Sequence, residues 1–459
     1  MAPATVRDDR ADSSVIRVLD RPNRGSYLES GRRWRAFLTG DCQAPLMRFA
    51  TGAVLLVIVA VLAGVGVVAF AGDDGGTLSE RWVSDTGRDM KGNHHAPAAA
   101  TIGNRSFVFA PISDQGNGTG CGLFALDGSN GSVVWRHQVP PANCTIHAVA
   151  DPTVADFDGD GTKEVLASST EERVTAYDAR SGEESMRHQL DDYGYTQPVV
   201  ANLAPDSGRE TAVVDVKGRL SLVRADGTAL WSRNLEGMAW AQPAAADFDA
   251  DGDTELVVGV APPDGGRVVL IDGNNTTEWQ TDDIDASILW MGSGQADDDP
   301  AIEISVATSD GEIVVLDGAD GSVEWRRSVG DLAAVHDISD GDGDGNPEVY
   351  AVSKEGTLFA LQATDGDIEW KTSLTTGTQM TPPPVVADVD GDDETELVAA
   401  TNDGKVTVVA PDSGNVLATY ERSVPIYTHP TVADLDGDGA EEIYVIYGDG
   451  RVVALLYES

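Results

Sequence analysis

The chain has 459 residues, and its 31 Lys and Arg against 76 Asp and Glu give a formal charge of −45. Hydrophobic residues make up 41%, which suffices for a large core and excludes wholesale disorder. A field of this sign repels phosphate, so general nucleic-acid binding is excluded as well. An acid-rich, lysine-poor composition is typical of proteins from salt-loving organisms, and it predicts a halophilic source.

The N-terminal part differs from the rest. Residues 1–47 are rich in arginine and lack a sustained apolar period, which predicts a mostly disordered tail. No charged residue occurs between Arg48 and Asp73. As a helix this run would extend about 36 Å, which predicts one transmembrane helix over residues 48–72. A cleaved signal peptide, with a small-residue cleavage site at 69–71, is the alternative.

The charges on either side of this run predict its orientation. The arginine-rich side should stay in the cytoplasm and the acidic side should face out. We therefore expect a single-pass protein of the cell membrane with a linker over residues 73–77 and an extracellular domain over residues 78–459.

Two motifs alternate through the extracellular part. The first reads P-x-x-A-D-x-D-G-D-G-x-x-E, as in DPTVADFDGDGTKE from residue 151, and its closing Glu recurs at 164, 210, 255, 303, 348, 396 and 442. The second is a strand, a turn and a strand ending in Trp, as in GLFALDGSNGSVVW from residue 122. β-branched residues that alternate around D-G or S-G turns indicate hairpins. Each repeat therefore supplies about four short strands.

Four-stranded units of this length are typical of propeller blades. The chain ends in RVVALLYES, a third strand without a fourth, while LSERWV at 78–83 is a fourth strand without a blade. We expect these two segments to share one blade, which closes the ring and removes both open edges. Trp or a substitute should mark the last strand of each of eight blades, with seven blades as the alternative. The eight positions are Trp82, Trp135, Met186, Trp231, Trp279, Trp325, Trp370 and Tyr420.

The Trp-ending motif resembles the PQQ-type, or quinoprotein-like, propeller repeat. The D-x-D-G-D-G motif resembles the calcium loops of FG-GAP and VCBS propeller repeats. Together these resemblances imply an all-β fold: an eight-bladed β-propeller of four-stranded antiparallel blades, preceded by one transmembrane helix. They leave the activity open, because such families include enzymes, adhesins and scaffolds.

Five copies of the first motif place carboxylates at loop positions 1, 3, 5 and 9. Ca²⁺ takes six to eight oxygen ligands, and acids at these offsets can surround it. We predict Ca²⁺ that stiffens these loops; Mg²⁺ or Na⁺ could substitute, and solvated turns are the alternative. The predicted ligands are Asp156, Asp158, Asp160 and Glu164; Asp247, Asp249, Asp251 and Glu255; Asp340, Asp342, Asp344 and Glu348; Asp388, Asp390, Asp392 and Glu396; and Asp434, Asp436, Asp438 and Glu442.

Two further copies of this motif are degraded. One contains Asn202, Ala204 and Asp206, and the other contains Gln295, Asp297 and Asp299. Both lack ligands by comparison with the five complete copies, and we expect them to bind nothing or to bind weakly.

Aromatic, His and polar residues gather just before the first motif, where a propeller places its channel mouth. A ring of such side chains around one axis is a candidate ligand site. Packing and hydrogen bonding between blades is the alternative. His94, Met380 and Tyr427 also occupy such positions. The candidate ligand-binding residues are His95, His147, Asp151, Tyr195, Gln197, Trp240, Gln242, Trp290, His336 and His429.

Three cysteines remain. Cys121 and Cys144 flank one hairpin on the outer side of the membrane, and we predict that they form a disulfide. Cys42 is expected to be a reduced thiol at the cytoplasmic edge of the span. N-x-S/T sequons, which allow glycosylation in this compartment, begin at Asn104, Asn117, Asn130, Asn143, Asn274 and Asn275.

These features favour a membrane-anchored cell-surface module that binds or scaffolds an envelope protein or glycan. A PQQ-dependent oxidoreductase and a purely structural envelope component are the alternatives. The resemblance to quinoproteins implies PQQ stacked on Trp with Ca²⁺ and an Asp base. Trp240, Trp290 and Asp151 could serve, but no motif fixes these roles and no adjacent Cys pair is present. We therefore assign no catalytic residue.

Overall fold

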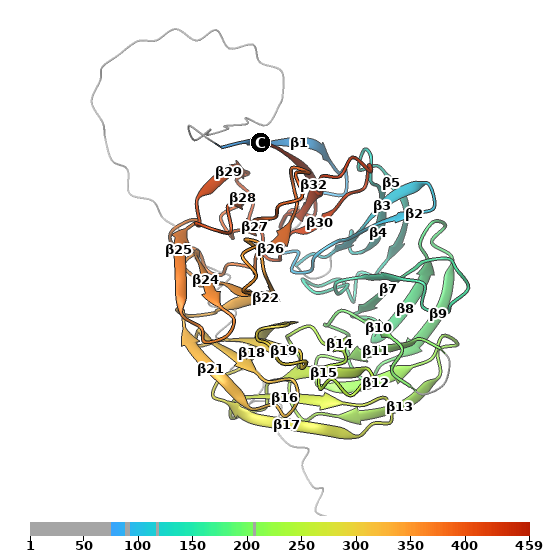
Figure 1. The fold of residues 1–459 in the computed structure, drawn as a ribbon. Coiled ribbons are helices and arrows are strands. Elements are labelled where there is room, and N and C mark those ends of the chain that lie inside the picture. Colours follow the sequence, from blue (N-terminus) through green and yellow to red (C-terminus); the bar gives the residue numbers. More distant parts are fainter. Residues whose placement is uncertain (1–74, 88–91, 116–118, 205–207) are drawn as a thin grey trace, which may run out of the picture. The chain divides into compact units, whose positions relative to one another are not determined.

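The computed structural model describes residues 75–87, 92–115, 119–204 and 208–459. These residues form eight four-stranded antiparallel sheets arranged as blades around one axis (Figure 1). The predicted eight-bladed, all-β propeller is confirmed, and the seven-bladed alternative is wrong. Within the described ranges no helix is long and apolar enough to span a membrane. The predicted tail and transmembrane helix, 1–72, lie outside those ranges.

Each blade runs from a short innermost strand to an exposed outermost strand. In the first four blades these are β2 (Ala98–Ile102), β3 (Arg105–Ile112), β4 (Gly122–Asp127) and β5 (Val133–Gln138); β6 (Thr153–Ala155), β7 (Glu164–Ser169), β8 (Arg173–Asp178) and β9 (Glu184–Gln189); β10 (Val199–Ala201), β11 (Glu210–Val214), β12 (Arg219–Val223) and β13 (Ala229–Asn234); and β14 (Ala244–Ala246), β15 (Glu255–Val260), β16 (Gly266–Ile271) and β17 (Thr277–Ile284).

The next three blades repeat this order, and the eighth takes its outermost strand from the N-terminal side. They consist of β18 (Ile288–Gly294), β19 (Glu303–Thr308), β20 (Glu312–Leu316) and β21 (Val323–Ser328); β22 (Ala334–Ser339), β23 (Glu348–Val352), β24 (Thr357–Gln362) and β25 (Ile368–Ser373); β26 (Val385–Ala387), β27 (Glu396–Ala400), β28 (Lys405–Val409) and β29 (Val416–Glu421); and β30 (Thr431–Ala433), β31 (Glu442–Ile446), β32 (Val452–Glu458) and β1 (Thr77–Val83).

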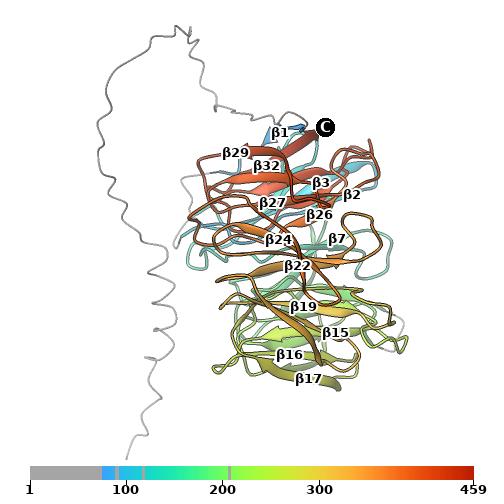
Figure 2. The same cartoon turned by 60° about the vertical axis from the view of Figure 1, so that its left-hand side comes forward.

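The ring closes between the two ends of the propeller. Strand β1 pairs with β32 in antiparallel register, from Thr77 opposite Glu458 to Val83 opposite Val453. Figures 1 and 2 show β1 lying beside the C-terminal strand in both views. The predicted shared blade is confirmed: β1 is its outermost strand, and β32 is paired on both sides.

The core lies between blades. The second strands are apolar runs such as ELVVGV in β15, whose six residues are all buried. The outermost strands are mostly exposed, as in β9. One hydrophobic cluster joins Phe107 and Phe109 of β3 to Val165 of β7, so it spans two neighbouring blades. Each blade thus completes the core of the next one.

Tryptophan at the outer edge fastens six of the eight blades to the blade that follows. Six indole Nε1 groups donate to a backbone carbonyl of the following blade at 2.6 to 3.1 Å. Several of these rings lie over a turn glycine of that blade. Gly321 has φ +72° and a Cβ there would collide with Trp279. The donors are Trp82, Trp135, Trp231, Trp279, Trp325 and Trp370.

Blade 7 departs from this pattern. Sequence analysis placed Tyr420 at the Trp position, but the register pairs Val408 with Ala418, as Val315 pairs with Trp325 in blade 5. The neighbouring blade is the shared one, whose third and fourth strands come from opposite ends of the chain. No hairpin turn joins them, so an indole would have no turn glycine to cover. Tyr420 instead hydrogen-bonds through its hydroxyl to Glu80 of β1.

Candidate functional sites

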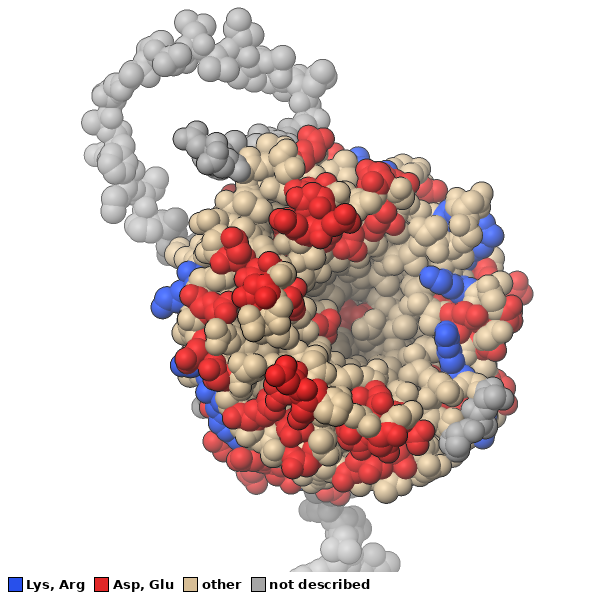
Figure 3. Space-filling model, in the orientation of Figure 1, with Lys and Arg blue, Asp and Glu red and all other residues tan. Residues whose placement is uncertain are grey.

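The predicted residues fall at opposite ends of the innermost strands. The carboxylate loops follow each innermost strand and lead into the second strand. The candidate axial residues precede the innermost strands, apart from Trp290 in β18 and His336 in β22, which lie within them. Because one strand separates the two sets, the loops open on one face of the ring and the axial residues gather toward the other. The ring is hollowed at its axis, with acidic patches around the rim (Figure 3).

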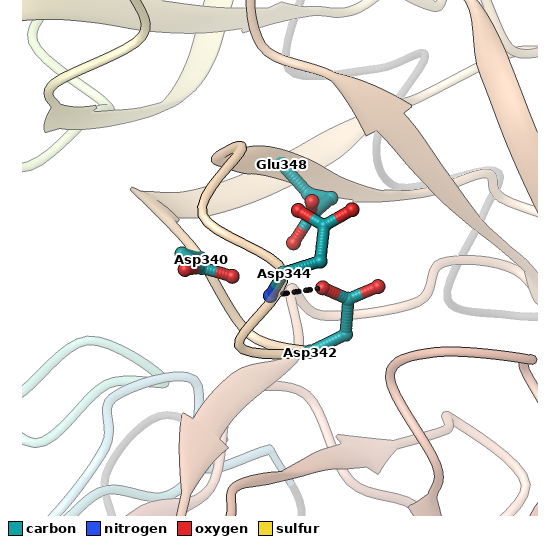
Figure 4. Close-up of side chains that lie close together, drawn as sticks. All are labelled: Asp340, Asp342, Asp344 and Glu348. Atoms are coloured by element: carbon teal, nitrogen blue, oxygen red, sulfur yellow. Dashed lines mark hydrogen bonds between the residues drawn. The ribbon is translucent and has the colours of Figure 1, made fainter.

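The loop of blade 6 shows the geometry of a carboxylate site (Figure 4). Asp340, Asp342, Asp344 and Glu348 bring one oxygen each to within 4.8 Å of the others. Backbone amides hold the loop: Asp344 N donates to Asp342 Oδ1 at 3.1 Å, and Gly345 N donates to Asp340 Oδ2 at 2.9 Å. Such a cluster of oxygens has the ligand type that Ca²⁺ or Mg²⁺ prefers.

Similar groups occur in other blades, although not with every predicted ligand. Asp160, Glu255 and Asp392 do not belong to these groups, and Asp160 instead accepts from Thr162 N at 2.8 Å. Asp156 Oδ1, Asp247 Oδ1 and Asp390 Oδ1 are buried without a hydrogen-bond partner. The groups are Asp156, Asp158 and Glu164; Asp247, Asp249 and Asp251; Asp388, Asp390 and Glu396; and Asp297, Asp299 and Glu303.

The closing Glu has a structural role that the sequence did not reveal. In blade 6 Glu348 Oε2 accepts from Gly341 N, seven residues earlier, at 3.1 Å. The same bond recurs in the complete loops of blades 2, 4, 7 and 8. It also recurs in the degraded loops, at Glu210 and Glu303. One carboxylate oxygen therefore shapes the loop, which leaves the other oxygen for a second partner.

Burial affects the titration of these groups. Desolvation, together with neighbouring acids, raises the pKa of the closing Glu to about 7 in five loops. A bound cation would counter this by favouring the ionised carboxylate. The five residues are Glu164, Glu255, Glu303, Glu348 and Glu396.

Blades 5 and 8 differ from the sequence-based assignment. In blade 5, which was expected to lack ligands, Asp297, Asp299 and Glu303 come together. In blade 8 the Arg81 guanidinium binds Asp436 Oδ2 at 2.7 Å and also contacts Glu442 Oε1. The degraded loop of blade 3 is described only in part, because Asp206 lies outside the described residues; its Leu203 and Ala204 amides both donate to Glu210.

The axial residues of blades 8 and 1 to 4 form a continuous chain of rings. His94 stacks on Tyr427 with centroids 4.5 Å apart. His147 packs edge-on against His94 and His95, at 4.9 and 5.3 Å. The chain of rings continues from His147 to Tyr195 and from Tyr195 to Trp240. The last two rings are nearly perpendicular, with their centroids 5.2 Å apart. We call these six residues the axial cluster.

Asp151 links several blades at the base of this cluster. Its Oδ2 lies 3.4 Å from His95 Nδ1 and also accepts from the Gln242 side chain. Its Oδ1 accepts from Ala96 N. Gln197 joins the network by donating through its backbone N–H to Gln242 Oε1 and through its side chain to Pro152 O. The candidate polar residues thus form the network between blades that the packing alternative anticipated.

Burial keeps part of the cluster uncharged. Desolvation and the neighbouring His95 lower the pKa of His94 to about 3. Desolvation and the other two imidazoles lower the pKa of His147 well below its usual range. Near neutral pH both rings are therefore neutral, and each has a nitrogen lone pair.

Trp290, His336 and His429 form a separate group. His429 packs edge-on against Trp290 at 6.2 Å and against His336 at 5.4 Å. Burial disfavours the charged form of His336, but its bond to Asp337 at 3.0 Å outweighs this and raises its pKa. Sequence analysis missed Asp337, which follows His336 directly. Only its position beside an axial His could have signalled it.

The predicted disulfide is confirmed. Cys121 and Cys144 are bonded, with their Cα atoms 5.5 Å apart. Both residues are fully buried within the cluster that joins the first two blades. The bond ties the start of β4 to the connection that leads toward the axial residues His147 and Asp151.

Comparisons with known proteins agree with this architecture. Residues 18–204 match the family model of outer membrane protein assembly factor BamB, a PQQ-type repeat, and residues 340–399 match that of the FG-GAP-like repeat. The chain is therefore a β-propeller built from PQQ-like and FG-GAP-like repeats, as the motifs predicted. A search among curated protein sequences returned no significant match.

Solved structures show the same fold at low sequence identity. BamB from Moraxella catarrhalis is 14% identical with a TM-score of 0.55, and the match covers 83% of this chain and 99% of that one. The quinohemoprotein alcohol dehydrogenase ADHIIG from Pseudomonas putida HK5 is 12% identical with a TM-score of 0.59, covering 83% and 76%. A europium-containing methanol dehydrogenase is 12% identical with a TM-score of 0.58, covering 80% and 84%.

The axial residues of this chain do not fit PQQ well. PQQ is an anionic quinone that carries carboxylates. The axial cluster offers imidazoles, phenols and an indole, and the neighbouring Asp151 adds a carboxyl group and no positive charge. Trp240 is engaged edge-to-face with Tyr195, and Trp290 with His429. We therefore derive no redox step from this site.

Proposed function

We propose that the protein is a cell-surface scaffold whose propeller binds another envelope protein at the axial cluster. The observation that carries this proposal is the cluster itself: aromatic and imidazole side chains from five blades meet beside the axis of a closed ring. Aromatic side chains with a polar atom are favoured at protein interfaces. The match to the family model of an assembly factor supports a role in holding proteins together.

The carboxylate loops serve this role by making the ring rigid. We propose that Ca²⁺ fills them, because oxygen atoms of several acids converge in each loop and some have no hydrogen-bond partner. A rigid surface loses less conformational freedom when it binds, so it binds more tightly. The carboxylates themselves take no part in chemistry.

The uncharged run at residues 49–72 supports a membrane anchor, with the propeller outside the cell. The short linker that follows would keep the ring near the membrane, which suits assembly at the envelope. Protease added to intact cells should then degrade the propeller and spare the N-terminal tail. Degradation only after lysis would contradict this topology.

Co-purification tests the binding role. The full chain is purified from membranes in high salt with Ca²⁺, as the wild type, as the double variant Tyr195→Ala/Trp240→Ala and as the control Glu394→Gln on the carboxylate face. We expect one defined envelope protein with the wild type and the control, and its loss with the double variant. Retention of that protein by a folded double variant would contradict the axial site. If nothing co-purifies, a purely structural role is favoured.

A PQQ titration tests the oxidoreductase alternative on the same samples. The titration follows Trp fluorescence of the Ca²⁺-loaded protein. The scaffold proposal expects no saturable quenching. Tight quenching that Trp240→Ala or Trp290→Ala weakens would instead favour a quinoprotein.

A further inference from the structure

One position in the fourth strand faces the carboxylate loop of its own blade. Each fourth strand contains a β-bulge directly before the Trp position. In blade 8 the register steps from Leu455 opposite Glu80 to Ala454 opposite Trp82, so it skips Arg81. In blade 5 it steps from Leu316 opposite Val323 to Val315 opposite Trp325, so it skips Glu324. The skipped residues, in order from blade 1 to blade 8, are Val134, Ser185, Leu230, Glu278, Glu324, Glu369, Leu417 and Arg81.

Arg81 shows how far a side chain at this position reaches. Its guanidinium bonds to Asp436 and to Glu442 Oε1 within the loop of blade 8. The other oxygen of Glu442 accepts from Leu435 N at 2.9 Å. Both oxygens of the buried closing carboxylate are therefore satisfied by groups of the chain. The positive charge that a metal ion would supply is already present.

Blade 5 has the opposite arrangement. Glu303 is fully buried, and its Oε2 accepts from Ala296 N. Its Oε1 has no hydrogen-bond partner. A buried carboxylate oxygen without a partner is costly, so it calls for a cation or a proton. Asp297 and Asp299 each place an oxygen within 4.8 Å of this carboxylate and of one another.

Glu324 adds an acid to this group where blade 8 has Arg81. The register skips Glu324 just as it skips Arg81, so Glu324 occupies the place from which Arg81 reaches its own loop. In the complete loop of blade 6 the fourth strand carries Glu369 at the same place. A carboxylate on the fourth strand can therefore supplement the three acids of the blade 5 loop.

We infer that blade 5 holds a divalent, oxygen-binding cation between Asp297, Asp299, Glu303 and Glu324, and that blade 8 holds none because Arg81 is its counter-ion. The inference takes the class of cation from the proposed function and reassigns where it binds. It has a consequence for assembly: β1 is fastened to the shared blade by a charge of the chain, so ring closure does not depend on a metal ion.

Counting bound Ca²⁺ tests the inference. The full chain is stripped with a chelator, loaded with Ca²⁺ in high salt and desalted, and the metal per chain is measured by elemental analysis. Asp297→Asn/Asp299→Asn should lose one ion per chain. Asp436→Asn/Asp438→Asn should lose none. Arg81→Gln should gain one ion, while Arg105→Gln, which removes a surface arginine of blade 1, should leave the count unchanged.

Glu324→Gln should weaken the blade 5 site several-fold in a Ca²⁺ titration. Glu369→Gln is the matched control, because its loop keeps four carboxylates of its own, and it should have a smaller effect. Far-ultraviolet circular dichroism verifies that each variant is folded. An unchanged count in the blade 5 variant, or a lost ion in the blade 8 variant, would overturn the inference while leaving Ca²⁺ stiffening intact. A wild type that binds no Ca²⁺ would overturn both.

Discussion

The two ends of the innermost strands show two ways of placing polar groups in one ring. At the carboxylate loops, acids within a few residues of each other converge, and backbone amides of the same loop hold them. At the axial cluster, residues far apart in sequence converge, as His94 does with Tyr427. The first arrangement is local and repeats from blade to blade. The second exists only once the ring has closed.

This difference implies that the two regions contribute differently. A convergence of acids is unfavourable without positive charge, so the loops should make stability depend on cations. Neutral rings that pack on one another carry no such requirement. We therefore expect the loops to control stability and the axial cluster to control binding. Measurements of stability, of its pH dependence and of partner binding can test that division.

Removal of cations should have the largest effect. A ligand at 100 times its Kd contributes about 2.7 kcal/mol for each site that binds only the native state. Because several loops lose their ion together, thermal unfolding in high salt should shift sharply downward with a chelator. Addition of Ca²⁺ should restore the midpoint. His147→Ala should show the same chelator-induced loss as the wild type, and a midpoint insensitive to the chelator would contradict the role of the loops.

The two functions of the closing Glu can be separated at Glu348. Glu348→Ala removes the acceptor for Gly341 N and for the Tyr350 hydroxyl, and should cost about 2 kcal/mol even without cation. Glu348→Gln keeps an acceptor of the same shape, so the chelated protein should be nearly as stable as the wild type. Both variants should bind one Ca²⁺ less. Denaturant unfolding with and without chelator distinguishes them, and equal destabilisation by both would refute a backbone role.

The two regions should also respond to pH with opposite sign. The closing Glu has a pKa raised to about 7, so the native state binds more protons than the unfolded state between about pH 4.5 and 7. The chelated protein should therefore lose stability as the pH rises through this range. Ca²⁺ should flatten or reverse that slope.

The axial imidazoles have lowered pKa values, so below about pH 6.5 the unfolded state binds the extra protons. Their contribution to stability should be lost as the pH falls. His147→Gln should reduce this acid-side loss and leave the slope caused by the loops unchanged. Unfolding midpoints from pH 5 to 8 provide the measurement. If His147→Gln also changed the slope that the closing Glu residues cause, the two regions would not be independent.

The smallest effect on stability is expected at the axis. His147 is half-buried and its side-chain polar contact is to one imidazole, that of His95, so His147→Ala should cost no more than about 1 kcal/mol. The same variant should still impair capture of the envelope partner. A loss of several kcal/mol would mean that the cluster mainly holds the ring together.

Much of the fold was accessible from the sequence because the information repeats. Each closing Glu and each Trp acts within a blade or toward its immediate neighbour, so spacing alone predicted eight blades and their closure. The error at Tyr420 arose where the repeat is interrupted. The turn that a Trp would cover is missing in the shared blade, and nothing in the local sequence of β29 records this.

The same distinction between local sequence and distant contacts applies to the carboxylate loops. The blades and their acid-rich loops could be predicted from the sequence, because they depend on residues close together in the chain. The closure could be predicted because the chain carries an incomplete blade at each end of the repeats. Only the tertiary structure decided which loops carry an uncompensated charge. Arg81 meets Glu442 through the pairing of β1 with β32, and the bulge before Trp325 puts Glu324 at the corresponding place in blade 5. Electrostatic interactions depend on distance in space, so the spacing of residues along the chain could not reveal them.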